Sequence, residues 1–251
     1  MSTGSGTATN RQPCLSVFVE RPAPLLPKPR AQRSLTIGIC SGAKTLPVSL
    51  HGRPALIISE CQRGIVEPGM GGFPGLIAQV DERGIIARIA DLAARFRAAR
   101  LPVFHLTIAH RPDFADVQRN SMLAAMARKG GSLVTGSPAA EIMPQLAPAT
   151  EDFIIERSSG LIGFHGTALD AMLRRLHIGT VVITGVSTNV AVAGCTLAAT
   201  DLGYHAIVAE DCIAAADPAT HDIIVRDQLR MVARIASAAD IAQALVTPGN
   251  Y

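Results

Sequence analysis

Tryptophan is absent from this 251-residue chain, and aromatic residues make up only 4% of it. Proteins that hold single-stranded nucleic acid usually stack its bases on aromatic side chains. No predicted helix face carries a dense basic block either, so we expect no nucleic-acid partner. No apolar stretch approaches the roughly 20 residues of a membrane span, so we expect no membrane partner.

The chain also lacks closely paired cysteines. Its five cysteines show no CxxC spacing, and three of them fall in or beside predicted core elements: Cys61, Cys195 and Cys212. We interpret these as reduced, packed thiols, which excludes a disulfide framework and a cysteine zinc site. With 48% hydrophobic and 17% charged residues, the composition suits one compact cytoplasmic domain with a large core and no cofactor.

Acidic residues are nearly missing from the first fifty positions, where Glu20 is the only acid before Glu60. Ser, Thr and Gly dominate the start, and several Pro stand with Lys and Arg at 21–33. Three interpretations stay open: a disordered tail, sequence translated upstream of the true start, or a transit peptide, against which the proline content argues. We expect a flexible or partly disordered extension at 1–50, with a short apolar run at 35–39, and one folded domain at 51–251.

From Arg53 onward, apolar β-branched runs alternate with amphipathic helices. Four strands are predicted at 55–59, 101–107, 152–155 and 181–183. A fifth strand is predicted in the apolar run that ends at 211, and a sixth before the last helix. Helices are predicted at 84–100, 116–128, 167–176 and 218–232, and the last helix ends near 245. Long connections are predicted at 61–82 and 130–150. The alternation predicts an α/β fold: a three-layer α/β/α sandwich around a mostly parallel, Rossmann-like sheet of five or six strands.

The segment Thr180–Asp211 is the most informative part of the chain. It reads as strand, turn, helix and strand, which is one parallel crossover unit. Ligands of parallel sheets bind where strands end and helices begin. The turn Gly185–Ala191 therefore lies where chemistry is expected.

This turn resembles the isochorismatase-like hydrolase superfamily, also called the cysteine hydrolases. In that family a strand is followed by Gly-Val, a few small or polar residues, and Val-Cys-Val at the start of a helix. This chain reads Val190-Ala191-Val192, so Ala191 stands where the family has its nucleophilic cysteine. The resemblance implies a strained, even cis, peptide bond near Val186-Ser187.

Two further segments extend the resemblance, which covers roughly residues 53 to 246. The run 53–62 is similar to the family's first strand, which ends in Asp-Met-Gln, and Glu60 stands at the Asp position. The run 153–157, followed by 164–169, resembles the segment that carries the family's Lys, and Arg157 is the nearest basic residue. The resemblance implies that Glu60, Arg157 and Ala191 occupy the three catalytic positions.

The residues themselves support this placement and leave alternatives. A carboxylate that ends a buried strand must be paired or hydrogen-bonded, so Glu60 is either an active-site acid or a partner of a loop or helix cap. Arg157 is either a surface cation or a fixed charge facing Glu60 or an anionic substrate. Because a nearby guanidinium lowers the pKa of a carboxyl, we expect Glu60 to act as a base or electrostatic anchor.

No covalent thioester can form at Ala191. Cys195 lies one helical turn deeper and is interpreted as core. The polar turn residues Ser187, Thr188 and Asn189 either make turn and N-cap hydrogen bonds or contact a ligand. No general base that could activate the Ser187 or Thr188 hydroxyl is evident in the sequence. Free N–H groups at the start of the helix could hold an oxyanion. The expected substrate-binding residues are Gln62, His165, Ser187, Thr188, Asn189 and Val190.

A metal site is the less favoured interpretation of His105 and His110, which flank the end of a predicted strand. Nicotinamidases, which belong to the same superfamily, place metal ligands in this region with an Asp-x-His pattern that is missing here. Solvated or core histidines are the alternative. We expect no metal.

Three functional classes remain open. The first is a hydrolase that cleaves a vinyl ether without a cysteine, as true isochorismatases do. The second is a hydrolase that activates water at Glu60 to cleave an amide or other C–N bond, and the third is an inactive binding or scaffold protein with the same fold. The expected partner is a small polar or anionic substrate. We also expect a homodimer or homotetramer, in which residues 62–82 or 130–150 close the neighbouring site.

Overall fold

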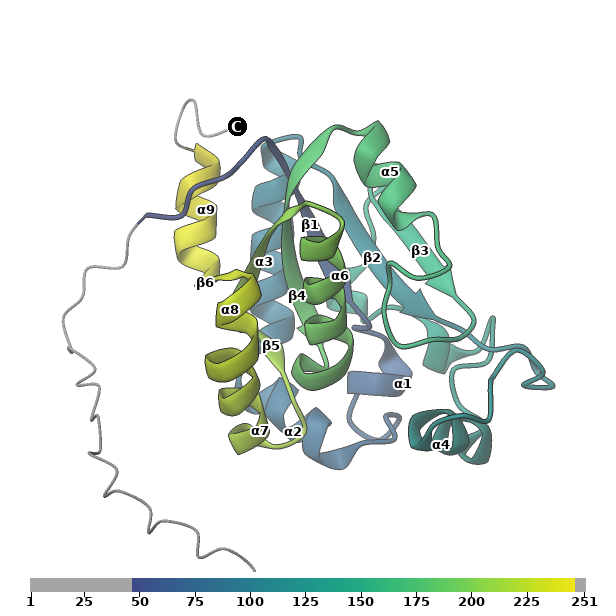
Figure 1. Ribbon diagram of the computed structural model, residues 1–251. Coiled ribbons are helices and arrows are strands. Elements are labelled where there is room, and N and C mark those ends of the chain that lie inside the picture. Colours follow the sequence, from purple (N-terminus) through teal and green to yellow (C-terminus); the bar gives the residue numbers. More distant parts are fainter. Residues whose placement is uncertain (1–46, 247–251) are drawn as a thin grey trace, which may run out of the picture. The chain divides into compact units, whose positions relative to one another are not determined.

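The computed structural model of this protein describes residues 47–246, so the expectations for the first 46 residues lie outside the described part (Figure 1). A six-stranded, all-parallel sheet with strand order β3-β2-β1-β4-β5-β6 forms its centre. This confirms the predicted fold. The strands are β1 (Arg53–Ser59), β2 (Val103–Ile108), β3 (Phe153–Arg157), β4 (Ile178–Val186), β5 (His205–Ala214) and β6 (Arg234–Ala236).

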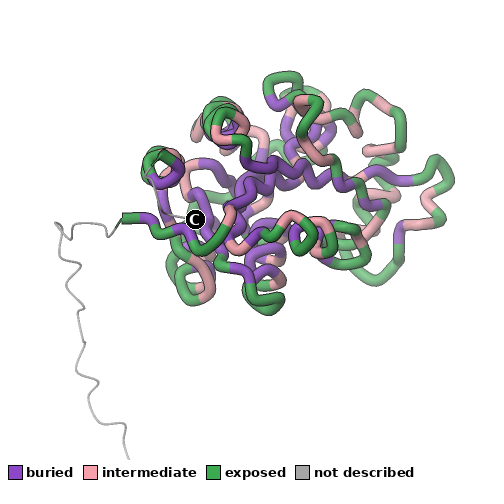
Figure 2. The backbone as a smooth tube through the Cα atoms, turned by 90° about the horizontal axis from the view of Figure 1, so that it is seen from above, coloured by how far each residue is buried: buried purple, intermediate pink, exposed green. Residues whose placement is uncertain are grey.

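Helices cover both faces of this sheet, and each face has its own apolar core. On one face, side chains such as Leu56 and Ile58 of β1 pack against α2 (Pro74–Glu82), α3 (Ile85–Ala98) and α9 (Ala238–Val246). On the other, Ala55 and Ile57 pack in a second core with α5 (Leu169–Arg175), α6 (Ala193–Asp201) and a helical run of α7 (Pro218–Ile223), η4 (Ile224–Leu229) and α8 (Arg230–Val232). Figure 2 shows buried strands between helices whose outer sides are exposed. Alternation of side chains along each strand divides the apolar residues between the two cores.

The long connection predicted at 61–82 contains two helices, α1 (Arg63–Val66) and α2. Pro74 occupies the first turn of α2, where its missing N–H costs nothing. Leu76 and Val80, four residues apart on one helix face, are buried in the core beneath α2. Glycine and proline masked this short amphipathic pattern in the sequence.

The predicted helix at 116–128 begins later, as α4 (Met122–Gly130), because Ser121 caps it: its hydroxyl oxygen accepts a 3.2 Å hydrogen bond from the Ala124 N–H. No residue of α4 is buried. The connection that follows holds two short helices, η1 (Pro138–Ala140) and η2 (Pro144–Leu146).

The carboxyl ends of β1 and β4 lie unusually close together. Gly185 has φ +98°, which side chains rarely adopt, and a Cβ there would clash with the carbonyl oxygen of Ser59. Only glycine permits this approach. The residues that follow these two strands, Glu60 and the turn after Val186, are therefore held at one edge of the sheet.

Candidate active site at the carboxyl edge of the sheet

Glu60 follows the last residue of β1 in a left-handed backbone conformation, with φ +51°. Its own N–H donates to the Leu106 carbonyl, and its carbonyl accepts from the Gln62 N–H, at 2.9 and 2.8 Å. A non-glycine residue with positive φ is uncommon and costs free energy, so it persists where surrounding contacts fix it. Those bonds turn the chain sharply and leave the Glu60 side chain at the carboxyl edge.

Arg157 is the last residue of β3, two strands away from β1. Its Nη2 donates to Oε1 of Glu60 in an ion pair that joins the ends of β3 and β1 across the end of β2, the strand between them. The side chains of Arg157 and Glu60 are 5% and 17% exposed. Nη1 of Arg157 also approaches the Thr107 carbonyl oxygen at 3.5 Å. The structure thus brings the predicted acid and base together.

Burial sets the charge state of this pair. It raises the pKa of the Glu60 carboxyl above its ordinary value of 4.5, although the charge of Arg157 and its hydrogen bond act in the opposite direction. Our expectation that Arg157 would dominate was therefore wrong: the loss of hydration outweighs the attraction. A carboxyl with a raised pKa exchanges protons closer to neutral pH, so the general-acid role that we had disfavoured becomes available.

Ala191 lies in η3 (Thr188–Val192), a π-helical turn that follows β4 and runs directly into α6. It is 2% exposed. One turn further along the helix, the charges of Glu60 and Arg157 act on the pKa of the Cys195 thiol in opposite directions. Burial nevertheless raises the pKa of this thiol to about 11, and its sulfur accepts from the Gly163 N–H at 3.3 Å. Cys195 is a core residue, as predicted.

The turn before η3 differs from the expected capping pattern. The peptide bond between Val186 and Ser187 is cis, as the resemblance implied. Ser187 occupies the N-cap position, yet its side chain makes no capping hydrogen bond. Ser187 and Val190 are half-buried and Asn189 is exposed, and the Ser187 carbonyl accepts from the N–H groups of Val190 and Val192 at 3.2 and 3.0 Å.

Gln62 connects neighbouring segments at this edge through its side-chain amide. Its side-chain Nε2 donates to the carbonyls of Ile108 and Ala140, at 2.9 and 2.7 Å, and its Oε1 accepts from the Ile108 N–H at 2.8 Å. The residue is 0% exposed. Because both amide hydrogens are engaged, we keep no substrate-binding role for Gln62. It fixes the end of β1 against β2 and η1, a role that sequence spacing could not indicate.

Three histidines are the remaining candidates. His165 is exposed, next to the buried Phe164, on the connection between β3 and α5. His105 bonds Oδ2 of Asp152 at 3.2 Å, and burial lowers its pKa. His110 lies 2.6 Å from the Ser158 carbonyl through Nδ1. Within residues 47–246, no three His, Cys, Asp or Glu side chains gather as metal ligands.

Sequence reasoning missed His221 of α7. Its Nδ1 lies 3.0 Å from the Thr188 hydroxyl oxygen, and the two residues are 2% and 0% exposed. The pairing connects positions 33 residues apart. In the sequence, His221 is only a histidine in the first helix after β5. The alternation of strands and helices does not distinguish it from other helical residues.

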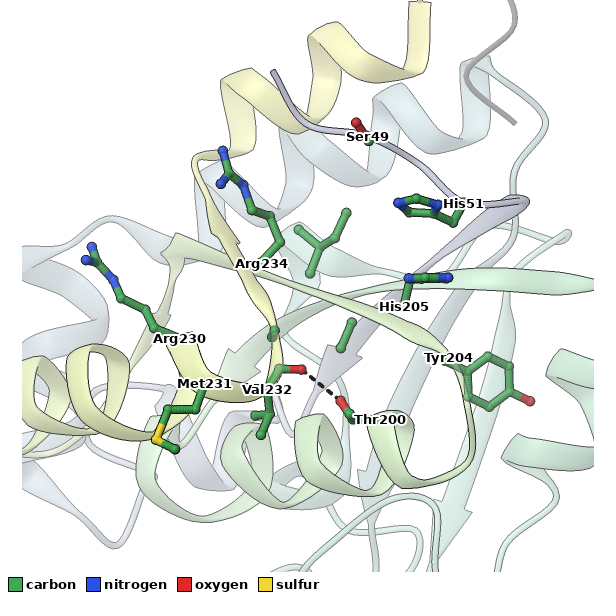
Figure 3. Close-up of a pocket in the computed structure, with 12 residues that line it drawn as sticks. Ser49, His51, Thr200, Tyr204, His205, Arg230, Met231, Val232 and Arg234 are labelled. Carbon is green, nitrogen blue, oxygen red and sulfur yellow. Dashed lines mark hydrogen bonds between the residues drawn. The ribbon is translucent and has the colours of Figure 1, made fainter. Parts of the chain in front are cut away.

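A hollow opens at the opposite, amino edge of the sheet (Figure 3). It has a volume of about 430 Å³ and is bordered by the stacked rings of His51 and His205, 4.0 Å apart, and by Thr200, whose hydroxyl donates to the Val232 carbonyl. We place the chemistry at the carboxyl edge instead, because ligands of parallel sheets bind there and the buried ion pair lies there. In the part of the chain that the structure describes, no helix could cross a membrane.

Comparisons with known proteins give consistent matches. Residues 54–240 match the family model for the isochorismatase domain. The chain is 31% identical over 200 residues to an isochorismatase family protein, YecD, of Escherichia coli O157:H7, covering 76% of this chain and 95% of the relative. It is 26% identical over 163 residues to maleamate amidohydrolase of Pseudomonas putida, covering 64% and 72% of the two chains.

Solved structures give the same fold. The crystal structure of an isochorismatase family protein from Desulfovibrio vulgaris superimposes with a TM-score of 0.69 at 27% identity, covering 78% of this chain and all of that one. N-carbamoylsarcosine amidase from Thermoplasma acidophilum superimposes with a TM-score of 0.59 at 24% identity, over 74% of this chain and 96% of that chain. Because the identity to the amidase is only 24%, this similarity supports the shared fold alone.

Proposed function

Because this chain belongs to the isochorismatase family, we propose that it is a hydrolase that cleaves an amide or other C–N bond of a small polar or anionic molecule without a cysteine nucleophile. The observation that carries the proposal is the buried ion pair between Glu60 and Arg157, at the edge where parallel strands end. Relatives named as amidohydrolases support the bond type. Ala191, at the position of the family's cysteine, supports a route without a covalent enzyme intermediate.

In this mechanism Glu60 handles the proton. Its carboxylate takes a proton from water while the water oxygen bonds to the amide carbon, which gives a tetrahedral oxyanion. Arg157 and the first N–H groups of the η3–α6 helix stabilise that negative charge. The protonated Glu60 then gives its proton to the departing nitrogen as the C–N bond breaks. The raised pKa of Glu60 suits both transfers.

The same carboxyl could instead protonate a vinyl ether, to which water then adds. Burial that raises the pKa of Glu60 favours this alternative as well, because it keeps more of the carboxyl in the acid form. The non-catalytic alternative is a small-molecule-binding protein, which the missing nucleophile at Ala191 favours.

Turnover by the parent separates the enzyme from the binding protein, and Glu60→Gln tests the role of Glu60. A screen of small amides, ureido acids and carboxylates for thermal stabilisation first identifies a ligand, and turnover is then measured with it. The variant keeps the shape of Glu60 but cannot carry a proton, so we expect activity to fall by about 100-fold or more. The matched control is Glu156→Gln, which changes an exposed acid one residue before Arg157. Ligands that bind but are not turned over by the parent would replace the hydrolase with the binding protein, whereas equal turnover by Glu60→Gln and the parent would overturn the catalytic role of Glu60.

A further inference from the structure

Thr188 and His221 form a buried polar contact that the proposed mechanism does not use. Thr188 begins the η3 turn, and His221 lies in α7, which Asp217 starts by accepting the Thr220 N–H at 2.8 Å. The Thr188 hydroxyl oxygen is 3.0 Å from His221 Nδ1. Both residues are almost completely buried. This contact joins the turn that carries Ala191 to the helix that follows β5.

The direction of this hydrogen bond follows from the two ring nitrogens of His221. Nε2 is buried and has no hydrogen-bond partner among the described residues. If Nδ1 carried the proton and donated, the Thr188 hydroxyl hydrogen and the Nε2 lone pair would be left over, whereas donation by the Thr188 hydroxyl to Nδ1 leaves the Nε2–H and the hydroxyl lone pairs. Either arrangement leaves one donor and one acceptor without a partner. The second is favoured, because the lone pair of an imidazole nitrogen is a stronger acceptor than a hydroxyl oxygen and costs more to leave unpaired.

The charges around His221 keep it in this neutral form. Burial lowers its pKa, the charge of Arg83 lowers it further, and Asp222 acts in the opposite direction. Arg83 is itself fixed, because its guanidinium donates to the carbonyls of Glu210 and Ile213, each at 3.1 Å. Protonation would place a hydrogen on Nδ1 and end its role as acceptor. The geometry therefore depends on a neutral imidazole.

We propose that His221 is a positioning residue of the carboxyl-edge site: its neutral Nδ1 accepts the Thr188 hydroxyl hydrogen and so fixes the η3 turn against α7. This rests on the proposed function, because the turn is where the oxyanion-stabilising N–H groups would lie. His221 itself need not touch substrate. It acts by preventing Thr188, and with it the start of the η3–α6 helix, from moving relative to Glu60.

Two variants of Thr188 test the contact. Thr188→Val keeps the shape and removes the hydroxyl, whereas Thr188→Ser keeps the hydroxyl. Nitrogen NMR of histidine-labelled protein reports which ring nitrogen carries the proton, with the His221 signal assigned from a His221→Gln sample. We expect the Nε2–H form in the parent and in Thr188→Ser, and a change in the ring-nitrogen signals in Thr188→Val. This measurement needs no substrate.

Kinetics then test the positioning role. With a substrate in hand, Thr188→Val should lower kcat about 10-fold with little change in KM, and Thr188→Ser should restore most of it. A parent protein that turns over nothing would count against the proposed function while the NMR result still decides the contact. A His221 that carries its proton on Nδ1, or that gives the same signals in Thr188→Val, would overturn the proposal, as would equal kcat in all three proteins.

Discussion

Glu60 and Arg157 are 97 positions apart in the sequence and form a buried ion pair across the carboxyl ends of three neighbouring strands. Glu60 follows β1, Arg157 ends β3, and β2 lies between them. Neither side chain could be buried alone at low cost, since an unpaired charge in a protein interior is strongly destabilising. The pair therefore couples the geometry of the proposed active site to the stability of the sheet.

The pH dependence of stability should reveal the raised pKa of Glu60. A carboxyl whose pKa is higher in the folded state binds its proton more tightly there. It thus contributes stability below its ordinary pKa of 4.5, and this stability is lost as the pH rises through the folded value. Glu60→Gln removes the titration. We expect urea unfolding at a series of pH values to show the parent losing stability relative to Glu60→Gln as the pH rises.

Glu156→Gln is the control for that measurement, because Glu156 is exposed. It should show a much smaller pH-dependent difference from the parent. A difference between the parent and Glu60→Gln that runs in the opposite direction would mean that Arg157, and not burial, controls the pKa of Glu60.

The buried thiols should be unreactive. Burial raises the pKa of Cys61 to about 12 and that of Cys195 to about 11, and it raises the pKa of Cys212 as well. Because the thiolate is the reactive form, we expect little reaction with Ellman's reagent at about pH 8 in a Cys14→Ser, Cys40→Ser variant. The three remaining thiols should react after unfolding in denaturant. Rapid reaction of one native thiol, together with loss of activity, would contradict a mechanism without cysteine.

Ala191→Cys tests whether the site can accept the family's nucleophile. A thiol near the start of a helix would have a lowered pKa. We expect weak esterase activity with p-nitrophenyl acetate, a burst that marks an acyl-enzyme, and loss of both after treatment with iodoacetamide. The matched control is Ala198→Cys, which places a thiol further along α6. Equal bursts from both variants would show that position 191 has no special environment.

The protein should associate with itself. Helix α4 buries none of its residues and exposes Met122 and Met126, which are 78% and 42% accessible. Exposed apolar side chains grouped on one helix commonly mark an interface. We expect light scattering to show a homodimer or homotetramer at micromolar concentration, and a Met122→Lys, Met126→Lys variant to shift toward the monomer. A monomeric parent would contradict this expectation.

Much of the fold follows from the sequence alone. Alternating apolar runs and amphipathic helices predicted a parallel sheet, because parallel strands need helical crossovers. That topology gathers the carboxyl ends of all strands at one edge, so an acid after β1 and a base at the end of β3 could be predicted to meet. The helical pattern of α2 was hidden, because glycine and proline near its start resemble a loop.

The sequence by itself determined which charges stand at the strand ends and that Ala191 holds no nucleophile. Only the tertiary structure decided how those groups are used. Burial, which depends on packing from distant segments, reversed the expected pKa shift of Glu60. The same packing occupied the Gln62 amide with main-chain partners and gave Thr188 the partner His221, 33 positions away. Periodicity records which face of an element is apolar, whereas hydration and hydrogen-bond partners depend on which other segments pack against it.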